Sequence, residues 1–128
     1  MTHITGIHHV TCISGDAQEN LDFYTTVLGM RMVKKSVNQD APDTYHLFFA
    51  DAEGHPGADL TFFPWPSMPR LRPGIGLSME VSLAIPAGTA SYWSERLRAN
   101  GIAIKAEETR FGDLALVADD PHGLHLAL

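Results

Sequence analysis

The sequence has little of what disulfide-bonded, membrane-spanning or secreted proteins carry. It contains one cysteine, Cys12, so no disulfide can form within the chain, and a reducing compartment is expected. No stretch approaches the roughly 18 apolar residues that a membrane span needs. The first residues show neither the basic start nor the apolar segment that is typical of a signal peptide. We therefore expect a cytoplasmic protein with no membrane partner.

Positive charge is also scarce. Nine Lys and Arg stand against 15 Asp and Glu, which gives a formal net charge of −6 at pH 7 and a pI near 5.5. Binding to a phosphate backbone needs clustered Lys and Arg, and Lys34-Lys35 is the only adjacent basic pair. A nucleic-acid partner is therefore not expected.

The composition itself is that of a small globular protein. The chain has 128 residues, of which 45% are apolar and 19% are charged. This balance is typical of one folded domain with a hydrophobic core. We therefore predict a single domain spanning residues 1–128.

The two halves of the sequence repeat each other. His9-Val10-Thr11 corresponds to Glu80-Val81-Ser82, 71 positions later, and residues 29–32 correspond to residues 101–104, 72 positions later. Identities are few, but the helix and strand signals recur in the same order. The repetition divides the domain into a first repeat at about 5–63, a connector at 64–76 and a second repeat at about 77–128.

Each half has the signals of one helix and four strands. In the first half, Asp16 is a candidate helix N-cap, apolar residues follow at helical spacing, and Gly29 ends the helix. In the second half, the spacing predicts a helix over Thr89–Ala99. Runs of strand-forming residues predict strands at 7–13, 30–37, 44–50 and 59–63, and again at 79–85, 102–107, 115–118 and 124–128.

A proline-rich segment separates the halves. Four prolines fall within residues 64–74. Proline lacks a backbone N–H, so this segment forms neither a helix nor a central strand. The sequence therefore predicts an α+β fold of two βαβββ repeats, in which curved half-barrel sheets carry their helices on the outside.

The predicted strands each have an apolar and a polar face, because side chains alternate along a strand. Apolar residues such as Leu60, Phe62 and Leu126 share one face, which is expected to pack on the helices. The opposite face is expected to line a concave surface. It carries His9, Asp59, Glu80 and His125.

These polar residues are of the types that hold a catalytic metal. Imidazole nitrogens with a carboxylate are typical of non-haem iron and zinc sites, and open positions on such a metal bind two substrate oxygens. His9, Glu80 and His125 are therefore candidate metal ligands. The alternative is a structural role for each of them, with no metal. His46 is a candidate acid–base residue or a solvated strand histidine, and His8 has the alternative of a residue partly buried under the first helix.

Several segments resemble a known family. Gly6-Ile7-His8-His9-Val10-Thr11 and the residues at 15–24, 27–38, 43–47 and 60–66 are similar to the N-terminal module of hydroquinone-type ring-cleaving dioxygenases. These enzymes belong to the vicinal-oxygen-chelate superfamily, whose fold is named after glyoxalase, bleomycin resistance protein and dihydroxybiphenyl dioxygenase. The rest of the chain resembles the superfamily in general. The resemblance covers nearly the whole chain and implies that fold.

The resemblance implies an Fe(II) enzyme that opens an aromatic diol with dioxygen. By position, it implies that His9 is the first-strand ligand and that His8 moves protons near the substrate. The fifth-strand ligand position falls on Glu80, where the dioxygenases have histidine. The eighth-strand glutamate position falls on Ala127, which cannot bind metal, and His125 is the substitute two residues earlier.

Three functions follow from these expectations. The first is metal-dependent ring cleavage of a catechol or hydroquinone, with His8 and His46 as acid–base groups. The second is a non-catalytic dimeric protein that binds a small molecule without metal, as bleomycin-resistance proteins do. The third is a glyoxalase- or epimerase-like lyase or isomerase that uses another divalent metal and a vicinal-oxygen substrate. Family dioxygenases combine two modules, so we expect a homodimer.

Overall fold

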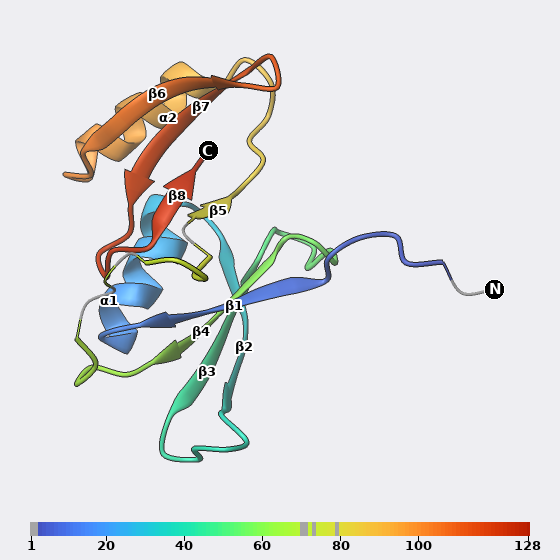
Figure 1. Ribbon diagram of the computed structural model, residues 1–128, viewed down its shortest axis with the longest axis vertical. Helices are drawn as coiled ribbons and strands as arrows, with labels where there is room; N and C mark the ends of the chain where they lie inside the picture. The colour runs from blue at the N-terminus through green and yellow to red at the C-terminus, as the bar shows by residue number, and fades with distance from the viewer. Residues whose placement is uncertain (1–2, 70–71, 73, 79) are drawn as a thin grey trace. The chain divides into compact units, whose positions relative to one another are not determined.

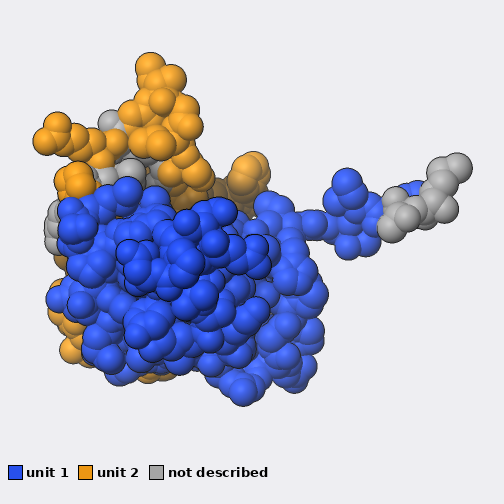
Figure 2. Space-filling model, turned by 90° about the horizontal axis from the view of Figure 1, so that it is seen from below, with its two compact units in different colours: residues 1–68 blue, residues 69–128 orange. Residues whose placement is uncertain are grey.

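The chain divides into two compact units, each of which has its own sheet. A computed structural model describes residues 3–69, 72, 74–78 and 80–128. Unit 1 comprises Met1–Met68 and unit 2 comprises Pro69–Leu128 (Figure 2). The division falls inside the predicted connector at 64–76, and the single-domain organisation stays a prediction. No helix in the described part of the chain is long and apolar enough to cross a membrane.

Unit 1 contains a four-stranded mixed sheet (Figure 1). The strands lie in the order β1-β4-β3-β2, with β1 parallel to β4 and the other neighbours antiparallel. Their bounds are β1 at His9–Ser14, β2 at Arg31–Val37, β3 at Tyr45–Ala50 and β4 at Asp59–Pro64.

Unit 2 repeats this topology. Its strands lie in the order β5-β8-β7-β6, with β5 parallel to β8. The elements are β5 at Glu80–Ser82, the helix α2 at Ala90–Ala99, β6 at Ile104–Arg110, β7 at Asp113–Asp119 and β8 at His125–Ala127. The prediction of an α+β fold with two βαβββ repeats is confirmed. Strands β5 and β8 are shorter than the predicted 79–85 and 124–128, and Met79 lies outside the described residues.

The helical segment of unit 1 differs from the single α-helix that the sequence predicts. Asp16 caps it as expected, because its carboxylate accepts hydrogen bonds from the backbone N–H groups of Gln18 and Glu19. The α-helix α1 covers only Ala17–Asp22, and a π-helix follows at Phe23–Val27. The Thr25 hydroxyl donates to the Leu21 carbonyl at 2.7 Å. This side chain competes with the backbone for the carbonyl, which favours the wider turn.

The core of unit 1 lies between this helical segment and one face of the sheet. Tyr24 is fully buried, and its ring centroid is 5.3 Å from that of Phe49 and 4.6 Å from that of Phe62. Leu47 and Leu60 are buried on the same side of the sheet. The alternating neighbours of these residues therefore point to the opposite face, where the polar side chains gather.

The hairpin between β6 and β7 extends further than the predicted strands at 102–107 and 115–118. Arg110 pairs with Asp113, and only Phe111 and Gly112 form the turn. Their φ angles are 54° and 96°, as in the type I′ turns that favour Asn-Gly. Phe111 is fully exposed, so burial of its ring does not offset the cost of a backbone conformation that bulky residues avoid.

We predict that Phe111→Asn raises the free energy of unfolding by about 1 kcal/mol, because the left-handed conformation costs a bulky residue roughly that amount. Urea unfolding of the two proteins measures the difference. Phe111→Ala is the control, since it removes the exposed ring but lacks the short polar side chain whose local hydrogen bonds let Asn adopt the left-handed conformation, and we expect it to gain less. A loss of stability in Phe111→Asn would show that the ring makes a stabilising contact.

Candidate functional site

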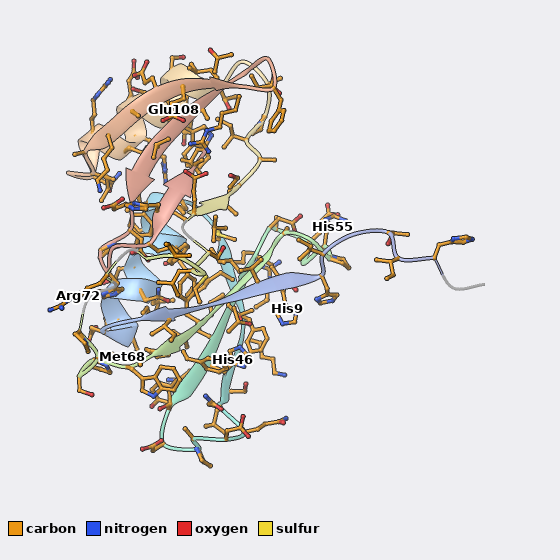
Figure 3. All side chains as sticks on the ribbon, in the orientation of Figure 1. His9, His46, His55, Met68, Arg72 and Glu108 are labelled. Carbon is orange, nitrogen blue, oxygen red and sulfur yellow. The ribbon has the colours of Figure 1, made fainter. Side chains whose placement is uncertain are left out.

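One face of the unit 1 sheet combines imidazoles, aromatic rings and hydroxyl groups. Each of the four strands contributes, because residues of the same parity in paired strands share a face. Figure 3 shows His9 and His46 on neighbouring parts of this sheet. We call the following residues the imidazole face: His9, Thr11, Lys34, His46, Phe48, Thr61 and Phe63.

His46 lies at the centre of the imidazole face. Its ring centroid is 4.0 Å from that of Phe48 and 4.2 Å from that of Phe63. Its Nε2 atom is 3.0 Å from the Oγ1 atom of Thr61, which is fully buried. Two rings and one hydroxyl therefore fix the plane and the orientation of the imidazole.

The surroundings of His46 favour its neutral form. Burial lowers the pKa of the His46 imidazole, and the positive charges of His9 and Lys34 lower it further. Lys34 reaches the face from β2, with its Nζ atom 5.1 Å from the centroid of the Phe48 ring. At neutral pH the His46 ring therefore keeps one unprotonated nitrogen, which can accept a proton.

His8 and His9 form a pair at the start of β1. Their Nδ1 atoms are 3.1 Å apart and their rings are nearly perpendicular. At this distance one Nδ1 donates its hydrogen and the other accepts it. The Nδ1 atom of His8 is also 3.9 Å from a carboxylate oxygen of Asp59. The alternative of a His8 partly buried under the helix is wrong, because its side chain is 68% exposed.

Unit 2 contains a separate cluster of charged residues around Arg110. The guanidinium donates to both carboxylate oxygens of Glu80, with the Nη2–Oε2 contact at 3.1 Å, and to Glu108 at 2.8 Å. The hydroxyl of Ser82 donates to the same Glu80 carboxylate at 3.2 Å. The hydrogen bonds from Arg110 lower the pKa of Glu80, and those to Glu80 and Glu108 raise the pKa of Arg110. Glu80 is therefore held as a carboxylate whose oxygens are already engaged.

His125 lies beside Glu80, because the two are register partners in β8 and β5. Its Nδ1 atom is 2.5 Å from the Asp119 carboxylate, which also pairs with Lys105. Burial acts to raise the pKa of Asp119, but the hydrogen bonds from Lys105 and His125 outweigh it and lower the pKa. This arrangement fixes the ring and leaves its Nε2 atom for a ligand, as partners of metal-binding histidines do.

The predicted site residues fall in both units. His8, His9 and His46 belong to unit 1, whereas Glu80 and His125 belong to unit 2. Within either unit, the described residues form no group of three or more His, Cys, Asp and Glu side chains that can hold a metal ion. His9 and His125 suit metal binding, since each ring has one nitrogen held by a neighbour. Glu80 does not suit it while Arg110 occupies its carboxylate.

Two functional partners were not predicted from the sequence. Thr61 alternates along β4 with the apolar core residues and so shares a face with Asp59 and Phe63. This alternation is a signal in the sequence that places Thr61 on the same face as the histidines. Arg110 lies beyond the predicted end of its strand at residue 107, so the ion pair with Glu80 had no signal in the strand pattern.

The fold and the site residues can be compared with known proteins. The sequence profile described as Glyoxalase/Bleomycin resistance protein/Dioxygenase superfamily matches residues 6–128. Since this match spans nearly the whole chain, the chain belongs to that superfamily.

Its relatives include proteins named as ring-cleaving dioxygenases. The chain is 46% identical over 123 residues to “Putative ring-cleaving dioxygenase MhqE” of Bacillus subtilis, which covers 96% of this chain and 40% of that protein. It is 35% identical to chlorohydroquinone/hydroquinone 1,2-dioxygenase of Sphingobium indicum, over 92% of this chain and 37% of the enzyme. The crystal structure of a “putative dioxygenase” from Bacillus subtilis superposes with a TM-score of 0.88 at 44% identity, covering 95% of this chain and 39% of that one. The chain thus spans about two fifths of the length of these relatives.

Proposed function

We propose that this chain is a dioxygenase-like module that binds a catechol or hydroquinone on the imidazole face and takes part in metal-dependent ring cleavage. The observation that carries the proposal is the position of His46 between Phe48 and Phe63, on the face that also holds His9. Similarity to relatives named as ring-cleaving dioxygenases supports the reaction class.

The imidazole face has the chemistry that an aromatic diol requires. Phe48 and Phe63 offer ring surfaces for stacking, which contributes about 1 kcal/mol beyond the burial of area. The neutral His46 ring accepts a hydrogen bond from a phenolic hydroxyl. The ammonium group of Lys34 stabilises the phenolate that forms when that hydroxyl loses its proton.

Fe(II) is the metal that we propose for this chemistry, since histidine and carboxylate ligands with open positions are typical of iron oxygenase sites. When bound, it would bring the diol and dioxygen together and carry the electron transfer between them. We propose His9 of unit 1 and His125 of unit 2 as ligands. Glu80 remains a proposed ligand only on the condition that Arg110 releases its carboxylate.

A second candidate function is binding without turnover. Ala127 has no donor atom at the position where the resemblance implies a glutamate ligand, and the Glu80 carboxylate is paired with Arg110. A chain with these two features would bind the aromatic compound on the imidazole face and hold no catalytic metal. In either case we propose a homodimer, in which a second copy would supply the second module that the resemblance to family dioxygenases implies.

The proposal predicts saturable binding of hydroquinone by the metal-free chain, measured by titration calorimetry. Phe48→Ala should weaken that binding about fivefold, the factor that corresponds to a stacking contribution of about 1 kcal/mol. Phe111→Ala is the matched control, because this ring is fully exposed on unit 2 and should not matter.

Reconstitution with Fe(II) under argon, followed by addition of oxygen, then separates the two candidate functions. Oxygen consumption with hydroquinone supports ring cleavage. Hydroquinone binding without oxygen consumption supports the binding module. If the chain does not bind hydroquinone or catechol at all, both candidate functions are wrong.

A further inference from the structure

Two consecutive hydrogen bonds connect the side chains of His46 on β3, Thr61 on β4 and Thr11 on β1. The Thr61 hydroxyl on β4 donates its hydrogen to Oγ1 of Thr11 on β1, at 2.9 Å. The same Thr61 oxygen lies 3.0 Å from Nε2 of His46 on β3. Because a hydroxyl has one hydrogen, Thr61 can only accept at its contact with His46. In this arrangement the hydrogen in the His46–Thr61 contact comes from Nε2.

This hydrogen-bond direction determines the tautomer of the histidine. A neutral imidazole carries a hydrogen on one ring nitrogen, so a hydrogen on Nε2 leaves Nδ1 with a free lone pair. Among the described residues, the hydrogen bond of the His46 side chain is the one at Nε2. Phe48 and Phe63 hold the ring plane, so the lone pair keeps a fixed direction on the imidazole face.

We propose that Thr61 and Thr11 are positioning residues that hold His46 in the Nε2–H tautomer, so that Nδ1 accepts the proton of a phenolic hydroxyl bound on the imidazole face. The identity of the ligand rests on the proposed function, whereas the tautomer is a property of the chain alone. Neither threonine needs to touch the ligand in order to act in this way.

In the proton transfer that follows, one bond breaks in the ligand and one bond forms on the His46 ring. The O–H bond of the phenol breaks and an N–H bond forms at Nδ1, which gives a phenolate and an imidazolium ion. The Nε2–H group keeps its hydrogen bond to Thr61, so the cation is stabilised where it forms. On this side of the sheet, the charged or titratable groups that accompany His46 include His9 on β1, Lys34 on β2 and Asp59 at the start of β4, and the charges of His9 and Lys34 act on the His46 ring. Lys34 favours the phenolate.

The tautomer is tested by nitrogen-15 NMR of the metal-free chain with labelled histidine, at mildly alkaline pH where the ring is neutral. His46→Gln identifies the resonances of His46 by their loss. In the wild type we expect a protonated Nε2 and an unprotonated Nδ1. In Thr11→Val, the Thr61 hydroxyl has no acceptor on β1 and can turn to donate to Nε2, so the Nδ1–H tautomer should appear.

Two further variants guard against effects of folding. Thr61→Val removes the hydroxyl from a fully buried position and should give a mixture of tautomers, whereas Thr61→Ser keeps the hydroxyl and should restore the wild-type spectrum. A wild-type Nδ1–H tautomer would overturn the proposal. So would an unchanged tautomer in a folded Thr11→Val chain, because Thr11 would then have no influence on His46.

The role of Nδ1 toward a ligand is tested with 4-nitrocatechol, whose absorption changes when a hydroxyl ionises. In the presence of a chelator, the bound compound should be more ionised than the free compound at the same pH. Thr11→Val should reduce the ionised share of the bound compound and weaken its binding about fivefold, because an Nδ1–H group cannot accept the phenolic proton and one hydrogen bond of about 1 kcal/mol is lost. The expected tautomer without any binding of nitrocatechol would overturn the phenolic role and the proposed function, and would leave the tautomer assignment standing.

Discussion

His9→Ala is expected to lower the affinity of the chain for Fe(II) by well over tenfold and to reduce iron-dependent oxygen consumption to background. Loss of a residue that merely supports a metal ligand already costs about tenfold to a hundredfold in affinity. Loss of a ligand itself should cost at least as much. The His9 ring suits this role because its Nδ1 is occupied by His8 at 3.1 Å and its other nitrogen remains for a metal. Anaerobic titration with Fe(II) and an oxygen electrode measure the two effects.

Two histidine variants make this comparison specific. His3→Ala removes an imidazole from the exposed N-terminal segment, away from the strands, and should leave both quantities unchanged. His8→Ala removes the hydrogen-bonding neighbour of His9 but no proposed ligand, so it should weaken iron binding less than His9→Ala does. Equal iron affinity in His9→Ala and His3→Ala would exclude His9 as a ligand.

Much of the fold could be predicted from the sequence, because the hydrophobic pattern depends on local alternation. Leu60 and Phe62 against Thr61 fix which face of β4 is buried, and the same parity places His46 opposite Leu47 on β3. The π-helix at Phe23–Val27 could not be predicted in this way. It coincides with a hydrogen bond from the Thr25 hydroxyl to the Leu21 carbonyl, whereas apolar spacing alone fits an ordinary α-helix.

The site was harder to predict from the sequence than the fold, because it depends on where the strands end. The sequence predicts β6 to stop at residue 107, and Phe111 is not a turn residue by type. The structure places a two-residue turn at Phe111-Gly112, which extends the strand to Arg110. A shift of register between Ile104 and Ala106 also changes which side chains share a face. The ion pair between Arg110 and Glu80 follows from these two features, and neither is visible in the alternation.

That ion pair decides whether Glu80 can bind metal. The carboxylate is 24% exposed, so its charge is partly desolvated and its pairing with Arg110 is only partly screened by water. A metal ion at Glu80 would have to displace a guanidinium that donates to both carboxylate oxygens. We therefore expect Glu80→Gln to leave the Fe(II) affinity of the otherwise unchanged chain as it is.

Removal of the Arg110 guanidinium should make the Glu80 carboxylate available to a metal ion. In Arg110→Met the Glu80 carboxylate loses its guanidinium partner beside His125, its register partner, and we expect Fe(II) affinity to rise about tenfold, the lower end of the effect of a ligand environment on metal affinity. Loss of the ion pair should also lower the free energy of unfolding without metal, by less than loss of a fully buried pair does, because both groups are partly exposed. Added iron should recover part of that loss, since a ligand that binds only the folded chain stabilises it.

Arg98→Met is the matched control, because Arg98 pairs with Glu107 on the surface at 3.7 Å and has no contact with Glu80. If Glu80→Gln instead weakens iron binding in the presence of Arg110 as strongly as His125→Ala does, Glu80 is a ligand that the guanidinium does not block.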